Sequence, residues 1–513
     1  MKPRENSEDI HQEKSPSFSV QFKNTTGSSV IGLFFGDADS KKGTVQNLDN
    51  KYENLDENAA IQDFTQKATI SGMKYVGDKK SRIPRRCFWL LVVLTGAGFL
   101  TYQIIRSVNL YRSFPVNVDV KIKYAQDLPF PAITICNMNL LRKKEMEKHN
   151  EKNVAGVLKL LYPLVTEIIE DSDALHNFTL SSVNNLTELL LRYGHRKEDM
   201  IIWCEWKGRR CSYENFTSTL TDYGLCHTFN SGSNGLPSLR VDNTGSEFST
   251  LGARYALTLI LNAEQWEYGR GPSQSAGFKI AIHSQYDIPM VSDLGFAVAP
   301  GTSAFIGLKM TKVSSFPEPY GTCKSRKLKY HGNYTMSKCQ LECLIDFIVE
   351  KCGCKRPYMP VAVDAPYCSP EEEYLCCLPK LDEYASHRQM CDCPVPCERT
   401  LYSASLSYAQ FPSDFMAVEY SKLLNKSDPQ YPRRNGAKLN IFFEELSYEE
   451  ISHRAAYELF TLFSDIGGSM GLLLGASFVT VVEIVDFACV NIYRRWRRKT
   501  SSKIYPKTSS NDR

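Results

Sequence analysis

Residues 88–105 read FWLLVVLTGAGFLTYQII, and this run of eighteen uncharged residues decides the class of fold. An α-helix rises ~1.5 Å per residue, so the run would cover roughly 27 Å of a bilayer core about 30 Å thick. It lies too far along the chain for a signal peptide. A second run, residues 466–490, reads IGGSMGLLLGASFVTVVEIVDFACV and is also long enough to cross a membrane, although it carries Glu483 and Asp486. The sequence therefore predicts two transmembrane helices.

Basic residues flank both apolar runs on the sides that lead to the two ends of the chain. The positive-inside rule places both termini in the cytosol and the long intervening region outside the cell, as expected for a two-span protein of the plasma membrane. The basic residues that carry this argument are Lys79, Lys80, Arg82, Arg85, Arg86, Arg494, Arg495, Arg497, Arg498 and Lys499.

Cysteines and glycosylation motifs agree with this orientation. Fifteen of the 17 cysteines lie between Cys136 and Cys397, a density typical of disulfide-bonded extracellular proteins. Asn24 carries a glycosylation motif on the cytosolic side, where we expect it to stay unmodified. The alternative of a soluble enzyme with two buried helices is therefore disfavoured. The external motifs, which we expect to be glycosylated, are at Asn177, Asn185, Asn215, Asn333 and Asn425.

These signals divide the chain into five regions. Residues 1–86 form a cytosolic N-terminal region, 87–108 the first transmembrane helix, 109–458 the cysteine-rich extracellular domain, 459–493 the second transmembrane helix, and 494–513 a basic cytosolic tail. Lys and Arg number 61 against 57 Asp and Glu, so the net charge of +4 is small for 513 residues. No basic field points to nucleic acid as a partner.

The external region mixes strand and helix patterns, which predicts an α+β membrane protein. A β-branched run at residues 130–137 predicts a buried strand. The run KLNIFFEEL, residues 438–446, predicts another strand, which leads through a helix into the second span. If this strand pairs with the chain that follows the first span, one sheet connects both spans. Further runs predict one sheet layer from residues 256–262, 278–284, 295–301 and 305–310, a helix from residues 154–169, and a disulfide-stapled helix from residues 341–350.

Acidic residues mark both ends of the second span, and ionisable groups inside a bilayer usually serve a function. Steps of three and four residues from Asp465 place Gly468, Leu472 and Asp486 on one helical stripe, with Glu483 beside it. We interpret Glu483 and Asp486 as acids of an aqueous cation path.

The centre of this span is Gly475-Ala476-Ser477. These small residues leave backbone carbonyls and a hydroxyl that can replace part of an ion's hydration shell. The alternative is that the glycines of the span only allow close helix packing. One such helix cannot enclose a channel, so a pore requires several copies around an axis.

The sequence contains no signature of an enzyme. No HExxH, phosphate-loop, nucleophile or dinucleotide motif occurs, so we expect neither catalysis nor a cofactor. Cys352-Gly353-Cys354 and Cys391-Asp392-Cys393 could indicate zinc, but disulfides are favoured in a cysteine-dense external region, and we expect no metal ion.

Seven motifs of this chain are similar to those of the superfamily that contains degenerins, epithelial sodium channels and acid-sensing ion channels. The resemblance runs from residue 130 to the second span. The motifs are FPAITICN (130–137), YGLCHTFN (223–230), IHSQ (282–285), VAPG (298–301), CDCPVPC (391–397), SDIGG (464–468) and GAS (475–477).

The resemblance implies a trimer, of identical or related subunits, that conducts sodium ions and is blocked by amiloride. Its external domain would have the hand-like parts named palm, finger, thumb, knuckle and β-ball. The implied site residues are Gly475, Ala476 and Ser477 in the selectivity filter, Asp465, Gly468 and Leu472 in the outer pore, Ser464 at a gating position, and Phe114 with Tyr320 as a contact that couples the first span to the thumb.

The resemblance also implies the disulfide pairs. Fifteen external cysteines leave one over, at Cys376 or Cys377. The implied pairs are Cys136 with Cys226, Cys204 with Cys211, Cys323 with Cys397, Cys339 with Cys393, Cys343 with Cys391, Cys354 with Cys368, and Cys352 with Cys376 or Cys377.

Two departures from the family pattern bear on gating. Ser71-Gly72 stands before the first span where the family normally has His-Gly, at a segment that takes part in gating. Residues 268–275 contain no acid, although Glu264 and Glu267 precede them, whereas acid-sensing members carry closely spaced acids there. Because a carboxylate's pKa rises most readily beside another acid, this loss weakens the case for proton gating. We favour an extracellular peptide as the opening ligand, with protons, constitutive activity, or a non-conducting receptor or adhesion role as alternatives.

Overall fold

The structure is a computed structural model, and it divides into two compact units that we describe separately. One contains residues 1–106 and 463–513, and the other residues 107–462. The structure describes residues 64–66, 70–78, 80–149, 154, 158, 161–162, 185–232, 239–242, 257–386, 391–424 and 427–504.

Long apolar helices dominate the first unit. Helix α4, Ile83–Arg112, is long and apolar enough to cross a membrane, and only 6% of its most apolar stretch is buried. Helices α16, Leu459–Leu474, and α17, Phe478–Ile504, form a second candidate span that is bent by 79° at the break between them. These helices expose large apolar side chains, as lipid-facing helices do. A short helix α3, Met73–Gly77, precedes α4.

A seven-stranded sheet organises the second unit, in the order β13-β12-β14-β9-β4-β5, with β1 paired to β14. The central strand β14 is twenty residues long, pairs with β9 and then β1 along one edge, and runs parallel to β12 along the other. The strands of this sheet are β1 Val116–Tyr124, β4 Ile201–Trp206, β5 Arg209–Cys211, β9 Leu257–Asn262, β12 Thr302–Ser314, β13 Glu398–Gln410 and β14 Gly436–Ala455.

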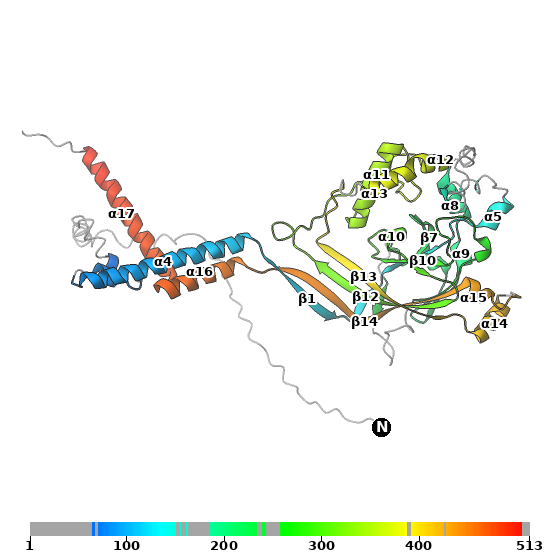
Figure 1. The fold of residues 1–513 in the computed structure, drawn as a ribbon, viewed down its shortest axis with the longest axis horizontal. Coiled ribbons are helices and arrows are strands. Elements are labelled where there is room, and N and C mark those ends of the chain that lie inside the picture. Colours follow the sequence, from blue (N-terminus) through cyan, green and yellow to red (C-terminus); the bar gives the residue numbers. More distant parts are fainter. Residues whose placement is uncertain are drawn as a thin grey trace, which may run out of the picture. The chain divides into compact units, whose positions relative to one another are not determined.

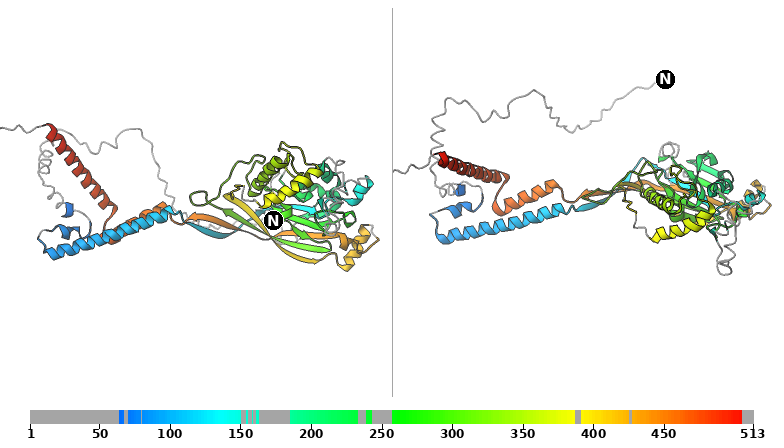
Figure 2. Two further views of the ribbon diagram at one scale, coloured as in Figure 1. Left: turned by 45° about the horizontal axis from the view of Figure 1, so that its top comes forward. Right: turned by 90° about the horizontal axis from the view of Figure 1, so that it is seen from above.

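Strand β14 confirms the predicted pairing between the strand before the second candidate span and the chain that follows the first. The prediction of a helix directly after residue 446 is wrong. Residues 447–455 are strand, and β1 pairs with them from Tyr124 opposite Ser447 to Val116 opposite Ala455. Figures 1 and 2 show the two strands side by side. Backbone hydrogen bonds to β1 and β12 satisfy the N–H and C=O groups of this segment on both edges. This strand pairing outweighs the helix propensity of its Glu and Ala residues.

A second sheet of five strands, in the order β11-β10-β3-β7-β6, packs against the first. The predicted strand at residues 130–137 is confirmed by β3, Ala132–Asn137, all of whose residues are buried. The prediction of one sheet layer from residue 256 to 310 is wrong, because β9 and β12 belong to the larger sheet and β10 and β11 to the smaller. The strands not yet placed are β2 Asp127–Pro129, β6 Phe216–Thr221, β7 Gly224–Phe229, β8 Arg240–Asp242, β10 Phe278–His283 and β11 Phe296–Val298.

The main core lies between these sheets. Ile135 of β3 and Phe278 of β10 belong to the same buried apolar cluster as Leu259, Ile306 and Ile441 of the larger sheet. Apolar side chains from the strands of both sheets point into this layer. The core therefore fixes the register of the strands in both sheets.

Helix α11, Met336–Cys352, confirms the helix predicted at residues 341–350. It groups with α12 Pro370–Glu372, η5 Glu373–Cys377 and α13 Leu378–Ser386 around a separate small core (Figure 1). Most of the helix predicted at 154–169 lies outside the described residues. The remaining helices are α5 Lys143–Lys148, α8 Leu186–Tyr193, α9 Lys197–Met200, η2 Tyr213–Asn215, η4 Gln265–Glu267, α10 Val291–Leu294, α14 Asp414–Leu423 and α15 Tyr431–Asn435.

Seven disulfides staple the second unit, and Cys352 bonds to Cys376. Cys377 is thus the unpaired cysteine of this unit among the described residues, and burial raises the pKa of its thiol to about 12. The remaining pairs are those that the family resemblance implied: Cys136–Cys226, Cys204–Cys211, Cys323–Cys397, Cys339–Cys393, Cys343–Cys391 and Cys354–Cys368.

We predict that the buried ion pair between Arg356 and Glu373 stabilises the α11–α13 region. Arg356 Nη2 lies 2.6 Å from Glu373 Oε1, and the Glu373 side chain is only 5% exposed. Glu373→Ala leaves the guanidinium buried without its carboxylate and should lower the free energy of unfolding by about 3–5 kcal/mol. Thermal unfolding of the full-length protein in detergent measures this. Glu383→Ala, which removes the partly exposed partner of Lys380, is the control and should cost less than about 1 kcal/mol. Equal losses would contradict the prediction.

Candidate functional site

The break between α16 and α17 falls on the predicted small-residue centre, Gly475-Ala476-Ser477. Gly475 has φ +58°, a left-handed conformation that glycine adopts without the steric cost of a side chain. Its N–H donates to the Gly471 carbonyl at 3.0 Å, and the Ala476 N–H donates to the Met470 carbonyl at 3.2 Å. These bonds close the end of α16 in the manner of a glycine C-cap.

A new helix starts directly after the break. The Ser477 N–H donates to Thr480 Oγ1 at 3.0 Å, and the Val481 N–H donates to the Ser477 carbonyl at 3.3 Å. The carbonyls of Gly475 and Ala476 therefore lie outside both helical ladders. Non-helical backbone at membrane depth is tolerated where it is buried in protein or lines a water-filled path, and carbonyls in such a position can coordinate a cation.

Ser71 and Gly72 pack against the same break. The Ser71 N–H donates to the Leu474 carbonyl, the last of α16, at 2.9 Å. A Cβ at Gly475 would lie 2.2 Å from Ser71 Oγ and 3.1 Å from Ser71 Cβ, so a larger residue here requires the Ser71 side chain to move. Gly72 has φ +90° and approaches the side chains of Val93 and Trp89 on α4. The segment before the first span thus supports the break directly.

The predicted pore-lining residues lie on an uncovered face of α16. Asp465, Gly468 and Leu472 are exposed, and Leu472 is 87% exposed. A Cβ placed at Gly468 would meet nothing within 4 Å. Ser464 is exposed as well.

One helical stripe from Asp465 to Asp486 was predicted, and this is wrong. Gly475 ends α16, and the 79° bend places Glu483 and Asp486 on a separate helix, α17. Glu483 is half-buried there and Asp486 is exposed.

Phe114 and Tyr320 are in contact, as the family resemblance implied. Their ring centroids lie 5.1 Å apart at an interplanar angle of 78°, an edge-to-face arrangement. Phe114 follows the C-terminal end of α4, and Tyr320 belongs to the turn after β12, so the contact joins the end of the first span to the segment that leads into α11.

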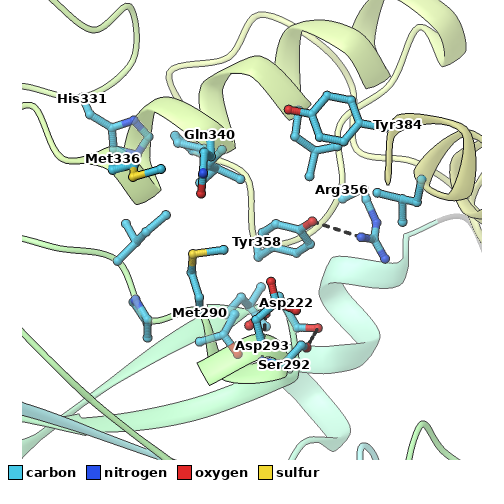
Figure 3. Close-up of a pocket in the computed structure, with 18 of the residues that line it drawn as sticks. Asp222, Met290, Ser292, Asp293, His331, Met336, Gln340, Arg356, Tyr358 and Tyr384 are labelled. Atoms are coloured by element: carbon cyan, nitrogen blue, oxygen red, sulfur yellow. Dashed lines mark hydrogen bonds between the residues drawn. The ribbon is translucent and has the colours of Figure 1, made fainter. Parts of the chain in front are cut away.

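A cavity of about 700 Å³ lies in the second unit, between α11 and α13 on one side and the segments around β6 and α10 on the other (Figure 3). Tyr358 lies between the two walls. Asp222, Met290 and Asp293 project from one wall, and the other wall presents His331, Met336, Gln340 and Tyr384.

Hydrogen bonds fix several polar groups of this cavity. Asp222 accepts from the Val291 N–H at 3.0 Å and the Ser292 N–H at 2.9 Å. Arg356 Nη1 donates to the Tyr358 hydroxyl at 3.0 Å. Volumes of 300–1,000 Å³ with apolar walls and a few placed polar groups are typical of ligand sites. Local sequence patterns do not indicate this cavity, because its walls come from several separate segments between Thr219 and Cys393 that only the fold brings together.

The predicted glycosylation sites are exposed where the structure describes them. Asn185, Asn215 and Asn333 all lie on the surface of the second unit. Asn185 Oδ1 also accepts from the Thr187 and Glu188 N–H groups at the start of α8. Asn177 and Asn425 lie outside the described residues.

Comparison with known proteins assigns the family. Residues 64–487 match the family model described as amiloride-sensitive sodium channel. The chain belongs to this family. It is 33% identical over 450 residues to acid-sensing ion channel 2 of Rattus norvegicus, covering 84% of this chain and 86% of the relative. It is also 33% identical over 475 residues to acid-sensing ion channel 1 of Gallus gallus, covering 88% of each chain. The ion-channel, sodium-transport, transmembrane and disulfide-bonded character predicted from the sequence is thereby confirmed.

We predict that Gly475→Ala alters ion selectivity. Alanine at φ +58° costs roughly 1–2 kcal/mol, and its Cβ would lie 2.2 Å from Ser71 Oγ, so the backbone at the break is strained and the Ser71 side chain must move. The sodium and potassium reversal potentials should move toward each other, and Ser477→Cys should move them as well. Gly98→Ala in α4, where a Cβ meets nothing within 4 Å, is the control. Unchanged selectivity in both Gly475→Ala and Ser477→Cys would rule out this filter assignment.

Proposed function

We propose that the chain is a subunit of a trimeric, sodium-selective, amiloride-blocked cation channel of the plasma membrane, opened by an extracellular ligand. Residues 87–108 and 459–493 cross the membrane, 109–458 lie outside as palm, finger, thumb, knuckle and β-ball, and both termini lie in the cytosol. The break at Gly475 carries this proposal, because it offers carbonyl groups outside the helical ladders within an otherwise apolar span. The role is transport rather than catalysis.

In this proposal three copies surround the pore. Asp465, Gly468 and Leu472 line its outer part, and their exposure in a single chain supports this role. Gly475-Ala476-Ser477 strips water from sodium, and Glu483 and Asp486 attract cations on the cytosolic side. A single helix cannot enclose a path, which is why the uncovered face of α16 requires further copies, identical or related.

Gating acts through three contacts. Phe114 against Tyr320 transmits movement of the α11–α13 region to the first span. Ser71-Gly72 holds the break from the N-terminal side. Ser464 lies on the exposed face of α16, where three copies would meet when the pore is closed.

A peptide is our preferred opening ligand. The cavity in Figure 3 is large enough for several side chains, and Asp222 and Asp293 give it a negative wall. Proton gating is the second candidate, because the curated relatives carry the name acid-sensing ion channel. A non-conducting receptor is the alternative from another class, and it leaves the broken helix unexplained.

Expression of the chain alone in oocytes tests this function. We expect an amiloride-blocked sodium current with a suitable extracellular peptide, and only a small current on a step from about pH 7.4 to roughly pH 6. The reason is that residues 268–275 lack acids, and carboxylates without close acidic partners titrate near their ordinary pKa of about 4. A large acid-evoked current without peptide would favour proton gating. Surface protein that never conducts, alone or with related subunits, would support the receptor alternative.

Ser464→Phe should raise the standing current. A bulky ring at a position where three helices converge prevents tight closure and so favours the open arrangement. The amiloride-sensitive current without ligand measures this, normalised to surface protein. Ser464→Ala, which stays small, should close normally. A Ser464→Phe channel that reaches the surface, responds to ligand and stays silent at rest would count against the gating role.

A further inference from the structure

The three N–H groups at the break between α16 and α17 are hydrogen-bonded in two different ways. The Gly475 and Ala476 N–H groups donate to backbone carbonyls near the end of α16. The Ser477 N–H donates instead to a side chain, at 3.0 Å from Thr480 Oγ1. Thr480 lies in the first turn of α17 and is only 1% exposed. One buried hydroxyl therefore completes the hydrogen bonding of these three groups.

A peptide group couples the direction of its N–H to the direction of its carbonyl. The Ser477 N–H and the Ala476 carbonyl belong to the same peptide group, which is planar and trans, so they point in opposite directions. The bond to Thr480 Oγ1 thus sets the direction of the Ala476 carbonyl oxygen. The Gly475 carbonyl is set in the same way by the bond from the Ala476 N–H to the Met470 carbonyl, which involves no side chain.

The Ala476 carbonyl oxygen lies beside the uncovered face of α16. A Cβ placed at Gly471 would lie 3.9 Å from this oxygen. Gly471 lies three residues after Gly468 and next to Leu472, and all three are exposed. The oxygen is therefore close to the residues that line the pore in the proposed function.

The carbonyls just before the break are covered by other parts of the first unit. The Leu474 carbonyl accepts from the Ser71 N–H at 2.9 Å. The Leu473 carbonyl oxygen would lie 3.3 Å from a Cβ at Gly96, so α4 packs closely against it. A cation at this depth would therefore meet the carbonyls of the break itself rather than those of the last turn of α16.

We propose that Thr480 is a positioning residue of the ion path, whose hydroxyl directs the Ala476 carbonyl toward the cation and holds the adjacent N–H away from it. The role in conduction rests on the proposed function, because Thr480 acts on the ion through the Ala476–Ser477 peptide group. Selectivity depends on the number and field strength of the carbonyl dipoles around an ion. Rotation of this peptide group would replace one of these carbonyls with an N–H, which repels a cation.

The simpler role for Thr480 is a helix cap. A side chain at the third position of a helix that accepts from the N–H of the residue before the helix is half of a capping box. Loss of such a cap would reduce the amount of folded protein at the cell surface. It would not change the selectivity of the channels that still conduct, so selectivity separates the two roles.

Reversal potentials test the role in conduction. Thr480→Val keeps the shape of the side chain but removes its oxygen, and should lower the sodium-to-potassium permeability ratio at least about twofold. Thr480→Ser retains the hydroxyl and should keep the wild-type ratio. Both are made in the Ser464→Phe background, where we expect a standing amiloride-sensitive current without ligand. Thr101→Val is the matched control, because Thr101 Oγ1 bonds to the Ala97 carbonyl at 2.9 Å within α4. It should leave the ratio unchanged.

Hydrogen–deuterium exchange tests the contact without any need for conduction. The exchange rate of the Ser477 amide is measured in the purified full-length protein in detergent, by mass spectrometry with fragmentation to single residues. Thr480→Val should raise this rate at least about fivefold, because the N–H loses its acceptor. Thr480→Ser and Thr101→Val should not raise it.

The two measurements distinguish failure of this proposal from failure of the proposed function. A conducting Thr480→Val channel with the wild-type permeability ratio overturns the proposal, and so does a ratio that falls equally in Thr480→Ser. An unchanged exchange rate in Thr480→Val overturns it as well, whether or not the protein conducts. If no variant conducts but the Ser477 amide responds as expected, the positioning of this peptide group by Thr480 is upheld and the channel function is contradicted.

Discussion

The second unit depends on one strand whose backbone groups are hydrogen-bonded along both edges. Strand β14 pairs with β9 and β1 on one edge and β12 on the other, so its backbone polar groups are hydrogen-bonded over most of its twenty residues. Its first half carries the core of the larger sheet through side chains such as Leu439 and Ile441. Its second half is held by β1, the strand that follows the first span. Other parts of the unit are attached to this frame by loops and disulfides.

The same frame is reached from distant parts of the second unit. The aromatic contact between Phe114 and Tyr320 and the cavity lie in different parts of this unit. Phe114 lies just before β1, and Tyr320 follows β12. In the proposed channel a ligand therefore needs no direct contact with the ions, since a change in how these strands are anchored is enough to bias a conformational equilibrium.

Local sequence signals predicted some of this structure and could not predict the rest. Apolar length identified the helices that are candidates for both spans, and a β-branched run identified β3, because these signals depend on neighbouring residues only. The sequence also indicated that Gly475 weakens the helix of the second candidate span, but a glycine alone does not predict a bend of 79°. Residues 447–455 were expected to be helical, since their partners in β1 lie over 300 residues away.

The functional clusters were the least predictable. Asp222 and Tyr358 each resemble an ordinary polar residue in sequence, and they line one cavity only because separate segments meet there. The family resemblance supplied the cysteine pairs, information that spacing alone did not contain.

The contact between Ser71 and Gly475 has a consequence for how such channels can diversify. Two positions about 400 residues apart share one small volume, because a single added carbon at Gly475 would lie 2.2 Å from Ser71 Oγ. A side chain added at Gly475 therefore requires the Ser71 hydroxyl to turn away or its segment to move. The segment before the first candidate span and the break in the second are thus sterically coupled, and a substitution at one position changes the space that is available at the other.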